Sequence, residues 1–160
     1  MFGKFRLTIR SGIELAFALV FGLIGVVLFL GTLDEFKAGR AFNRAMDAYA
    51  EHVLEDVHDF LNEAIDAKPD YDPPREVYAK LLLDEGRENP ARFADAKKVF
   101  EDLEGRQVAR TGRASLAVHI GLALADLGAA RAKNPSAEEL QAALAAARQR
   151  LEKALELYPS

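Results

Sequence analysis

The sequence predicts an all-α protein in which a single N-terminal transmembrane helix precedes an array of about three helix pairs. Residues 15–33 read LAFALVFGLIGVVLFLGTL without a single charge. The rest of the chain is rich in Ala, Glu, Asp, Lys and Arg, a composition that favours helix. No segment keeps the alternation of apolar and polar residues that is typical of strands.

The predicted transmembrane helix covers residues 12–33, between a short basic tail (1–11) and a soluble domain (34–160). Nineteen uncharged residues rising about 1.5 Å each span roughly 28 Å, close to the ~30 Å hydrocarbon core. A buried helix of a soluble protein is one alternative, but it would rarely be apolar on every face. A cleavable signal peptide is the other, and it needs a shorter apolar core and a small residue where Leu33 stands.

Charge is distributed unevenly between the two parts of the chain. The net charge of −4 divides into +2 for residues 1–33 and −6 for the remainder. An acidic soluble part argues against nucleic-acid binding, which needs a basic surface. Basic residues flank both ends of the predicted span, and the short tail before it is the more concentrated cluster. The positive-inside rule therefore places the N-terminus in the cytoplasm and the domain outside, which in a bacterial inner membrane means the periplasm.

Small residues lie near one face of the predicted transmembrane helix, namely Ala18, Gly22 and Gly25. This spacing lets a second helix approach closely, so these residues are candidate packing positions for a partner helix. The alternative is that glycine is simply frequent in membrane helices.

We predict about six helices in the soluble part, joined by short turns. The first of them continues from the membrane and ends in a turn near residues 50–52. Asp72-Pro73 signals the start of another helix, which ends before Gly86. Asn89-Pro90 starts the next, which should reach about Leu103 and be followed by a polar, basic connection over residues 105–112.

Two further helices complete the predicted domain. One covers about residues 113–127 and is closed by Gly128. The last begins with a capping box formed by Ser136 and Glu139 and ends before Pro159. Its apolar residues recur at helical spacing and should face the core: Leu140, Leu144, Ala147, Leu151, Ala154 and Leu155.

One spacing of small and large residues recurs along the soluble part. The copies are Val57-x3-Leu61-x2-Ala64, Ala96-x3-Phe100-x2-Leu103 and Ala147-x3-Leu151-x2-Ala154, and they alternate with Tyr78-Ala79-x2-Leu82-x3-Gly86 and Ile120-Gly121-x2-Leu124-x3-Gly128. Together they resemble the tetratricopeptide repeat (TPR), in which small residues let paired helices approach and large residues fill the space between pairs. A generic helical bundle is the alternative, and the first pair, with Ala45 and Ala48, matches least.

The TPR resemblance implies a scaffold that holds a peptide or helix in a concave groove lined by the first helix of each pair. On this alignment the groove residues would be Phe42, Met46, Tyr49, Glu76, Lys80, Leu83, Val118, Leu122 and Asp126. The competing interpretation is that these residues pack against neighbouring helices of the chain itself.

No pattern of catalytic or metal-binding residues stands out. The chain has no cysteine, which excludes disulfides and thiolate metal sites. Glu55-x-x-His58 is only half of a helical two-metal site, and Ser115 with His119 lacks an orienting carboxylate. We therefore expect no catalytic residue, cofactor, metal or small-molecule substrate.

These features predict a single-pass membrane scaffold or adaptor that recruits or holds a soluble protein or peptide segment beside other membrane-protein subunits. The alternative is a permanent accessory subunit of a membrane complex, without a dissociable client. An acidic helix face over residues 51–66 is either solvated or meets a basic partner.

Overall fold

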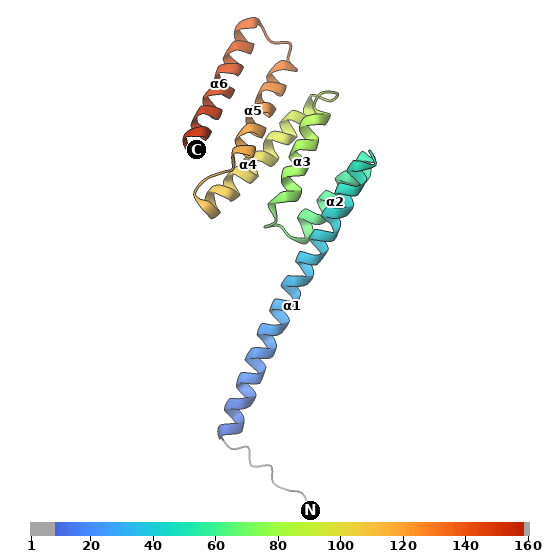
Figure 1. Ribbon diagram of the computed structural model, residues 1–160, viewed down its shortest axis with the longest axis vertical. Coiled ribbons are helices and arrows are strands. Elements are labelled where there is room, and N and C mark those ends of the chain that lie inside the picture. The colour runs from blue at the N-terminus through green and yellow to red at the C-terminus, as the bar shows by residue number, and fades with distance from the viewer. Residues whose placement is uncertain (1–8, 159–160) are drawn as a thin grey trace, which may run out of the picture.

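The computed structural model describes residues 9–158 and contains six helices over that range, confirming the all-α prediction. They are α1 (Ile9–Ala50), α2 (Leu54–Ala67), α3 (Asp72–Glu85), α4 (Ala91–Thr111), α5 (Leu116–Arg131) and α6 (Ala137–Glu156). Each helix packs against the next along the chain, and α3 also contacts α5. Figure 1 shows the N-terminal half of α1 projecting away from a layered array formed by the other helices.

Helix α1 runs for 42 residues without a break, so the apolar segment and the domain share one continuous helix. It begins three residues before the predicted boundary at residue 12 and does not end at residue 33. Residues 1–8 of the predicted basic tail lie outside the described residues. Because α1 is continuous, it fixes the orientation of the domain relative to the apolar segment.

The apolar half of α1 makes no core contact with the rest of the described chain. Its large side chains between Phe17 and Leu30 keep 47% to 69% of their surface exposed. Among the described residues, α1 is the one helix long and apolar enough to cross a membrane. Its exposure excludes the interpretation as a buried core helix of this domain.

The second half of α1 packs against α2 through small residues. Ala38, Ala41, Ala45 and Ala48 are buried on one face of α1. Helix α2 presents buried side chains from the recurring spacing, among them Leu61. Alanine carries only a Cβ, so the two helix axes approach closely. The turn between them lies at residues 51–53, as predicted, and His52 adopts a positive φ of 61° there.

Two cores share helix α3. One core joins α1, α2 and the α3 residue Leu81, and the other joins α3, α4 and α5 around Phe100. In the second core, Phe100 of α4 stacks directly on Gly121 of α5, where a Cβ would lie 2.3 Å from the ring. The glycine of the recurring pattern therefore makes room for the largest buried side chain of the domain.

Helix α4 is longer than predicted, and the expected connection over residues 105–112 is helical up to Thr111. Long-range contacts stabilise this extension: Arg106 donates to the Pro69 carbonyl at 2.8 Å, and Arg110 pairs with Asp72. These contacts offset the cost of about 1 kcal/mol that Gly105 imposes inside a helix. The helix ends instead at Gly112, whose φ of 78° is the left-handed conformation that favours glycine.

Helix α5 ends later than predicted, whereas helix α6 begins with the predicted cap. Gly128 lies inside α5, which continues to Arg131, so it does not close that helix. The predicted capping box is present, since Ser136 Oγ accepts from Glu139 N–H and Glu139 accepts from Ser136 N–H. The hydrogen bond from Ser136 N–H lowers the pKa of the Glu139 carboxyl.

The apolar stripe of α6 is only partly covered by the domain. Ala147 and Ala154 are buried against the array, as expected. Leu144 and Leu155 are 51% and 56% exposed, so the prediction that they face the core is wrong. No helix follows α6 within the described residues, so nothing there covers its outer face.

Replacing Ser136 with alanine should destabilise the domain by about 1 kcal/mol, because the first turn of α6 loses a side-chain acceptor. Chemical denaturation of the full chain in detergent, followed by circular dichroism, measures this change. Ser115 caps α5 in the same way, through Val118 N–H at 3.4 Å, and Ser115→Ala provides a comparison. An unchanged denaturation midpoint for Ser136→Ala would contradict the assigned cap.

Candidate partner-binding groove

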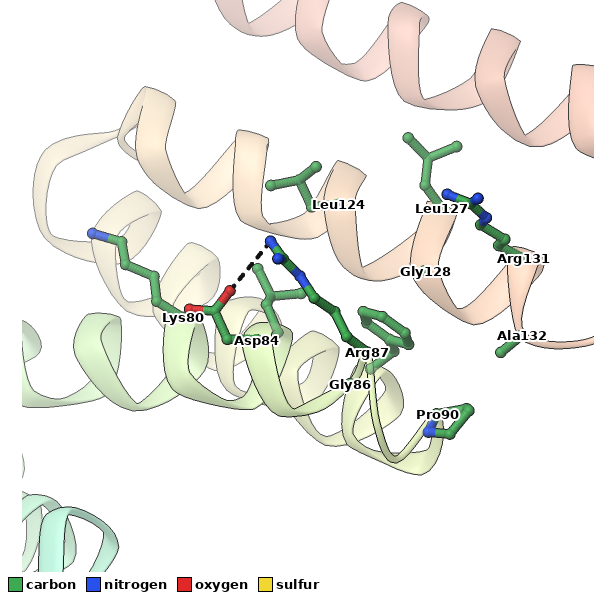
Figure 2. Close-up of a pocket in the computed structure, with 12 residues that line it drawn as sticks. Lys80, Asp84, Gly86, Arg87, Pro90, Leu124, Leu127, Gly128, Arg131 and Ala132 are labelled. Carbon is green, nitrogen blue, oxygen red and sulfur yellow. Dashed lines mark ion pairs between the residues drawn. The ribbon is translucent and has the colours of Figure 1, made fainter. Parts of the chain in front are cut away.

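A groove of about 800 Å³ runs between α3 and α5 and across the start of α4 (Figure 2). We call it the α3–α5 groove. Its lining residues are Lys80, Leu83, Asp84, Gly86, Arg87, Pro90, Phe93, Leu124, Leu127, Gly128, Arg131 and Ala132. The groove therefore lies between α3 and α5, which the repeat alignment predicts to be the first helices of the second and third pairs.

Phe93 of α4 is a large apolar residue of the groove, and two glycines make room for its ring. A Cβ added to Gly86 would lie 2.7 Å from the ring, and one added to Gly128 would lie 2.3 Å from it. Both separations are too short for real contacts, so any side chain at either position would displace the ring. Gly86 and Gly128 are the last residues of the two first-helix copies of the recurring pattern, so each has a packing reason at this site.

The lining of the groove carries a net positive charge, whereas the domain as a whole is acidic. Lys80, Arg87 and Arg131 contribute three positive charges against the single carboxylate of Asp84. Arg87 lies 3.6 Å from Asp84, and both side chains are well exposed (Figure 2). Lys80 and Arg131 have no ion-pair partner among residues 9–158. Since residues 34–160 carry −6 overall, this groove is a local positive site on an acidic surface.

Apolar side chains stand among these charges. Leu124 of α5 is 51% exposed, and Leu83 and Leu127 are half-buried in the groove. An exposed leucine inside a concave surface favours burial of a partner's apolar side chain. Basic residues around an apolar surface suit a polypeptide segment that combines apolar anchors with acidic residues.

The structure places two of the predicted groove residues, Lys80 and Leu83, in the α3–α5 groove. Val118 and Leu122 are fully buried in the core around Phe100, so they cannot contact a partner there. Helix α5 is apolar on nearly every face, and periodicity alone therefore could not identify its exposed side. The α5 residues that do line the groove begin at Leu124.

Glu76 and Asp126 face α4 and not the groove. Gln107 donates its side-chain amide to Glu76 at 3.3 Å, and Lys97 donates to Asp126 at 2.7 Å. Both carboxylates therefore stabilise packing between helices. For Glu76 and Asp126, the structure therefore shows the competing interpretation, in which these residues pack against a neighbouring helix of the chain itself.

The residues predicted from the first helix pair lie on α1, outside the α3–α5 groove. Phe42 is half-buried and contacts the Tyr71 ring edge-on, at a centroid distance of 6.1 Å. Met46 and Tyr49 are 40% and 42% exposed. The groove is thus lined by residues of α3, α4, α5 and their adjoining turns, and α1 contributes none of its residues.

The small residues of the apolar segment are open to an approaching helix. No atom lies within 4 Å of a Cβ added to Gly22 or Gly25. Ala18 lies in α1, but its side chain is outside the described residues. The packing role of this face stays a prediction.

The histidines contact carboxylates one at a time. His58 Nε2 lies 2.5 Å from Glu85 Oε1 and links α2 to α3, whereas Glu55 is exposed. His119 Nδ1 lies 3.4 Å from Glu104 Oε1, between α5 and α4. Within residues 9–158, no group of three or more His, Cys, Asp or Glu side chains is placed to hold a metal ion.

Comparisons of the chain with protein-family models, with curated proteins and with solved structures give no match.

Proposed function

We propose that the protein is a single-pass membrane scaffold whose helical domain holds a segment of a partner protein in the α3–α5 groove. The observation that carries the proposal is the combination of an exposed leucine, an apolar phenylalanine and three basic side chains in one concavity. The partner is a soluble protein or a segment of a neighbouring membrane subunit.

The membrane part of the proposal rests on α1. A cleavable signal peptide would separate from the mature domain, but α1 passes unbroken from the apolar segment into the first core. Cleavage after residue 33 would leave a helix end at the edge of the packed domain. These contacts support an uncleaved anchor. For its orientation we propose a cytoplasmic N-terminus and a periplasmic domain in a bacterium, on the basis of the basic N-terminal tail.

The scaffold part of the proposal rests on the helix pairs. The recurring small and large residues are buried in α2 and α4, as the TPR resemblance requires of second helices. Such arrays bind partners with the first helices of their pairs, and on the TPR alignment α3 and α5 would be two of these first helices. Tethering to the membrane raises the effective concentration of a partner in the same complex, so a modest groove affinity suffices.

A photoreactive amino acid at Arg87 tests this proposal, because the Arg87 side chain is 81% exposed and lies in the groove. Irradiation of native membranes should give a discrete crosslinked band. Leu124→Glu should abolish that band, since it places a carboxylate in the apolar surface. Ile120→Glu is the matched control, one turn away on α5, 40% exposed and outside the groove. Equal bands in both variants, or no band at all, would refute groove binding.

The second candidate function is a permanent accessory subunit with no dissociable client. The exposed Leu144 and Leu155 on the outer face of α6 favour it, because fixed subunit interfaces commonly cover such apolar faces. Detergent extraction followed by a salt wash separates the two functions. A groove-bound client dissociates with salt, whereas a permanent complex keeps constant stoichiometry.

A further inference from the structure

The turn between α1 and α2 carries apolar side chains that the domain leaves uncovered. Tyr49, Val53 and Leu54 are 42%, 42% and 46% exposed. They lie at the end of the first helix pair, next to the positive-φ turn at His52. A packed domain usually covers three large apolar residues at a turn, so their exposure marks an interaction surface.

The same turn is strongly acidic. Glu51, Glu55, Asp56 and Asp59 are all exposed, and none has an ion-pair partner among the described residues. Together with Tyr49, Val53 and Leu54 they form what we call the acidic tip. The acidic tip combines apolar anchors with carboxylates, which is the chemistry that the α3–α5 groove is suited to bind.

The tip and the groove lie at the same end of the array. The α1–α2, α3–α4 and α5–α6 turns all lie at the end of the domain away from the apolar half of α1 (Figure 1). The groove includes residues of the α3–α4 turn and the C-terminal end of α5. Two copies anchored in one membrane therefore present tip and groove at comparable height above the bilayer.

The tip of a chain cannot enter its own groove, because α1 and α2 are packed on the other side of α3. We propose that the acidic tip of one copy docks in the α3–α5 groove of a neighbouring copy. Val53 or Leu54 contacts Leu124, and the carboxylates of the tip face Lys80 and Arg131. This contact is head-to-tail, so it generates a row or a ring of anchored copies.

This inference rests on the proposed function, since it names a second copy of the chain as an occupant of the groove. Confinement to one membrane favours the contact in two ways. It raises the local concentration of the second copy, and it fixes the orientation in which tip and groove meet. The opposite charges guide the approach and disfavour tip-to-tip contacts.

Disulfide trapping tests the proposal in the full-length chain, which has no natural cysteine. The variant Val53→Cys, Leu124→Cys is reconstituted in phosphatidylcholine vesicles and oxidised with copper phenanthroline. A head-to-tail contact gives a ladder of dimers, trimers and larger species on a denaturing gel. The control Val53→Cys, Ile120→Cys carries its second cysteine outside the groove and should give dimers at most.

Charge reversal provides a second test of the head-to-tail contact. Lys80→Glu with Arg131→Glu, in the trapping background, should lower the crosslinked fraction on the order of tenfold. Adding Glu55→Lys and Asp56→Lys to the same chain should restore the ladder. The self-docking inference is overturned if the crosslinked fraction never exceeds that of the control. It is also overturned if neither set of charge reversals changes the crosslinked fraction.

The two proposals fail in different ways. A photo-crosslink from Arg87 to another protein, together with no disulfide ladder, overturns self-docking and leaves the scaffold function standing. The loss of both signals overturns the groove as a binding site. A ladder together with a photo-crosslinked band at twice the mass of the chain supports self-docking directly.

Discussion

Replacing Gly121 with leucine is expected to destabilise the domain by roughly 1–3 kcal/mol, through overpacking of its central core. Even the Cβ of a new side chain would lie 2.3 Å from the Phe100 ring. Phe100 is 1% exposed and surrounded by Leu103 and Val118, so its ring has no space to move into. Urea denaturation of the full chain in detergent micelles, followed by circular dichroism, measures the loss.

Two further variants make this prediction specific to the contact between α4 and α5. Gly105→Ala introduces a Cβ that meets nothing within 4 Å, so it should leave stability unchanged or raise it by about 0.5–1 kcal/mol. Phe100→Leu combined with Gly121→Ala should show a favourable coupling, because the smaller side chain at position 100 provides space for the new methyl group. If Gly121→Leu melts like the unmodified chain, the assigned contact between these helices is wrong.

Placing charges in the apolar half of α1 is expected to release the chain from the membrane. Ile24→Asp with Val27→Asp should cost about 2.5–3.5 kcal/mol of insertion free energy for each substitution near the centre of the span. Both native side chains are exposed on the helix, so neither change disturbs the packed domain. Fractionation of expressing cells measures the share of the chain in the membrane pellet.

Phe36→Asp is the matched control for this prediction. Phe36 is 68% exposed on the same helix but follows the uncharged stretch. Its replacement should leave the chain in the membrane. If the double variant fractionates like the control, then the apolar half of α1 is covered by protein and not by lipid.

The sequence was sufficient to predict features that depend on residues close together in the chain. The capping box at Ser136, the start at Asp72 with its proline, and the turn near His52 each depend on residues close together in the chain. The unbroken apolar stretch likewise depends on composition alone. The capping box appears at the predicted residues, and the start of α3 and the turn after α1 lie within one residue of their predicted positions.

Features that depend on distant residues were not predictable. The extension of α4 beyond Leu103 depends on Arg106 and Arg110 meeting the α2–α3 turn, about 37 to 40 residues earlier in the chain. The burial of Val118 and Leu122 could not be deduced, because α5 is apolar on nearly every face and its few polar residues do not mark a single exposed side. The basic side chains of the groove come from α3, from the α3–α4 turn and from the end of α5, which no single spacing connects.

Sodium carbonate extraction of native membranes tests most directly whether α1 anchors the protein in lipid. High pH removes peripheral proteins and leaves chains whose apolar helices cross the hydrocarbon core. A lipid-embedded α1 keeps the full-length chain in the pellet until detergent is added. Recovery of the chain in the carbonate supernatant would contradict the anchor, and with it the scaffold function and the head-to-tail contact.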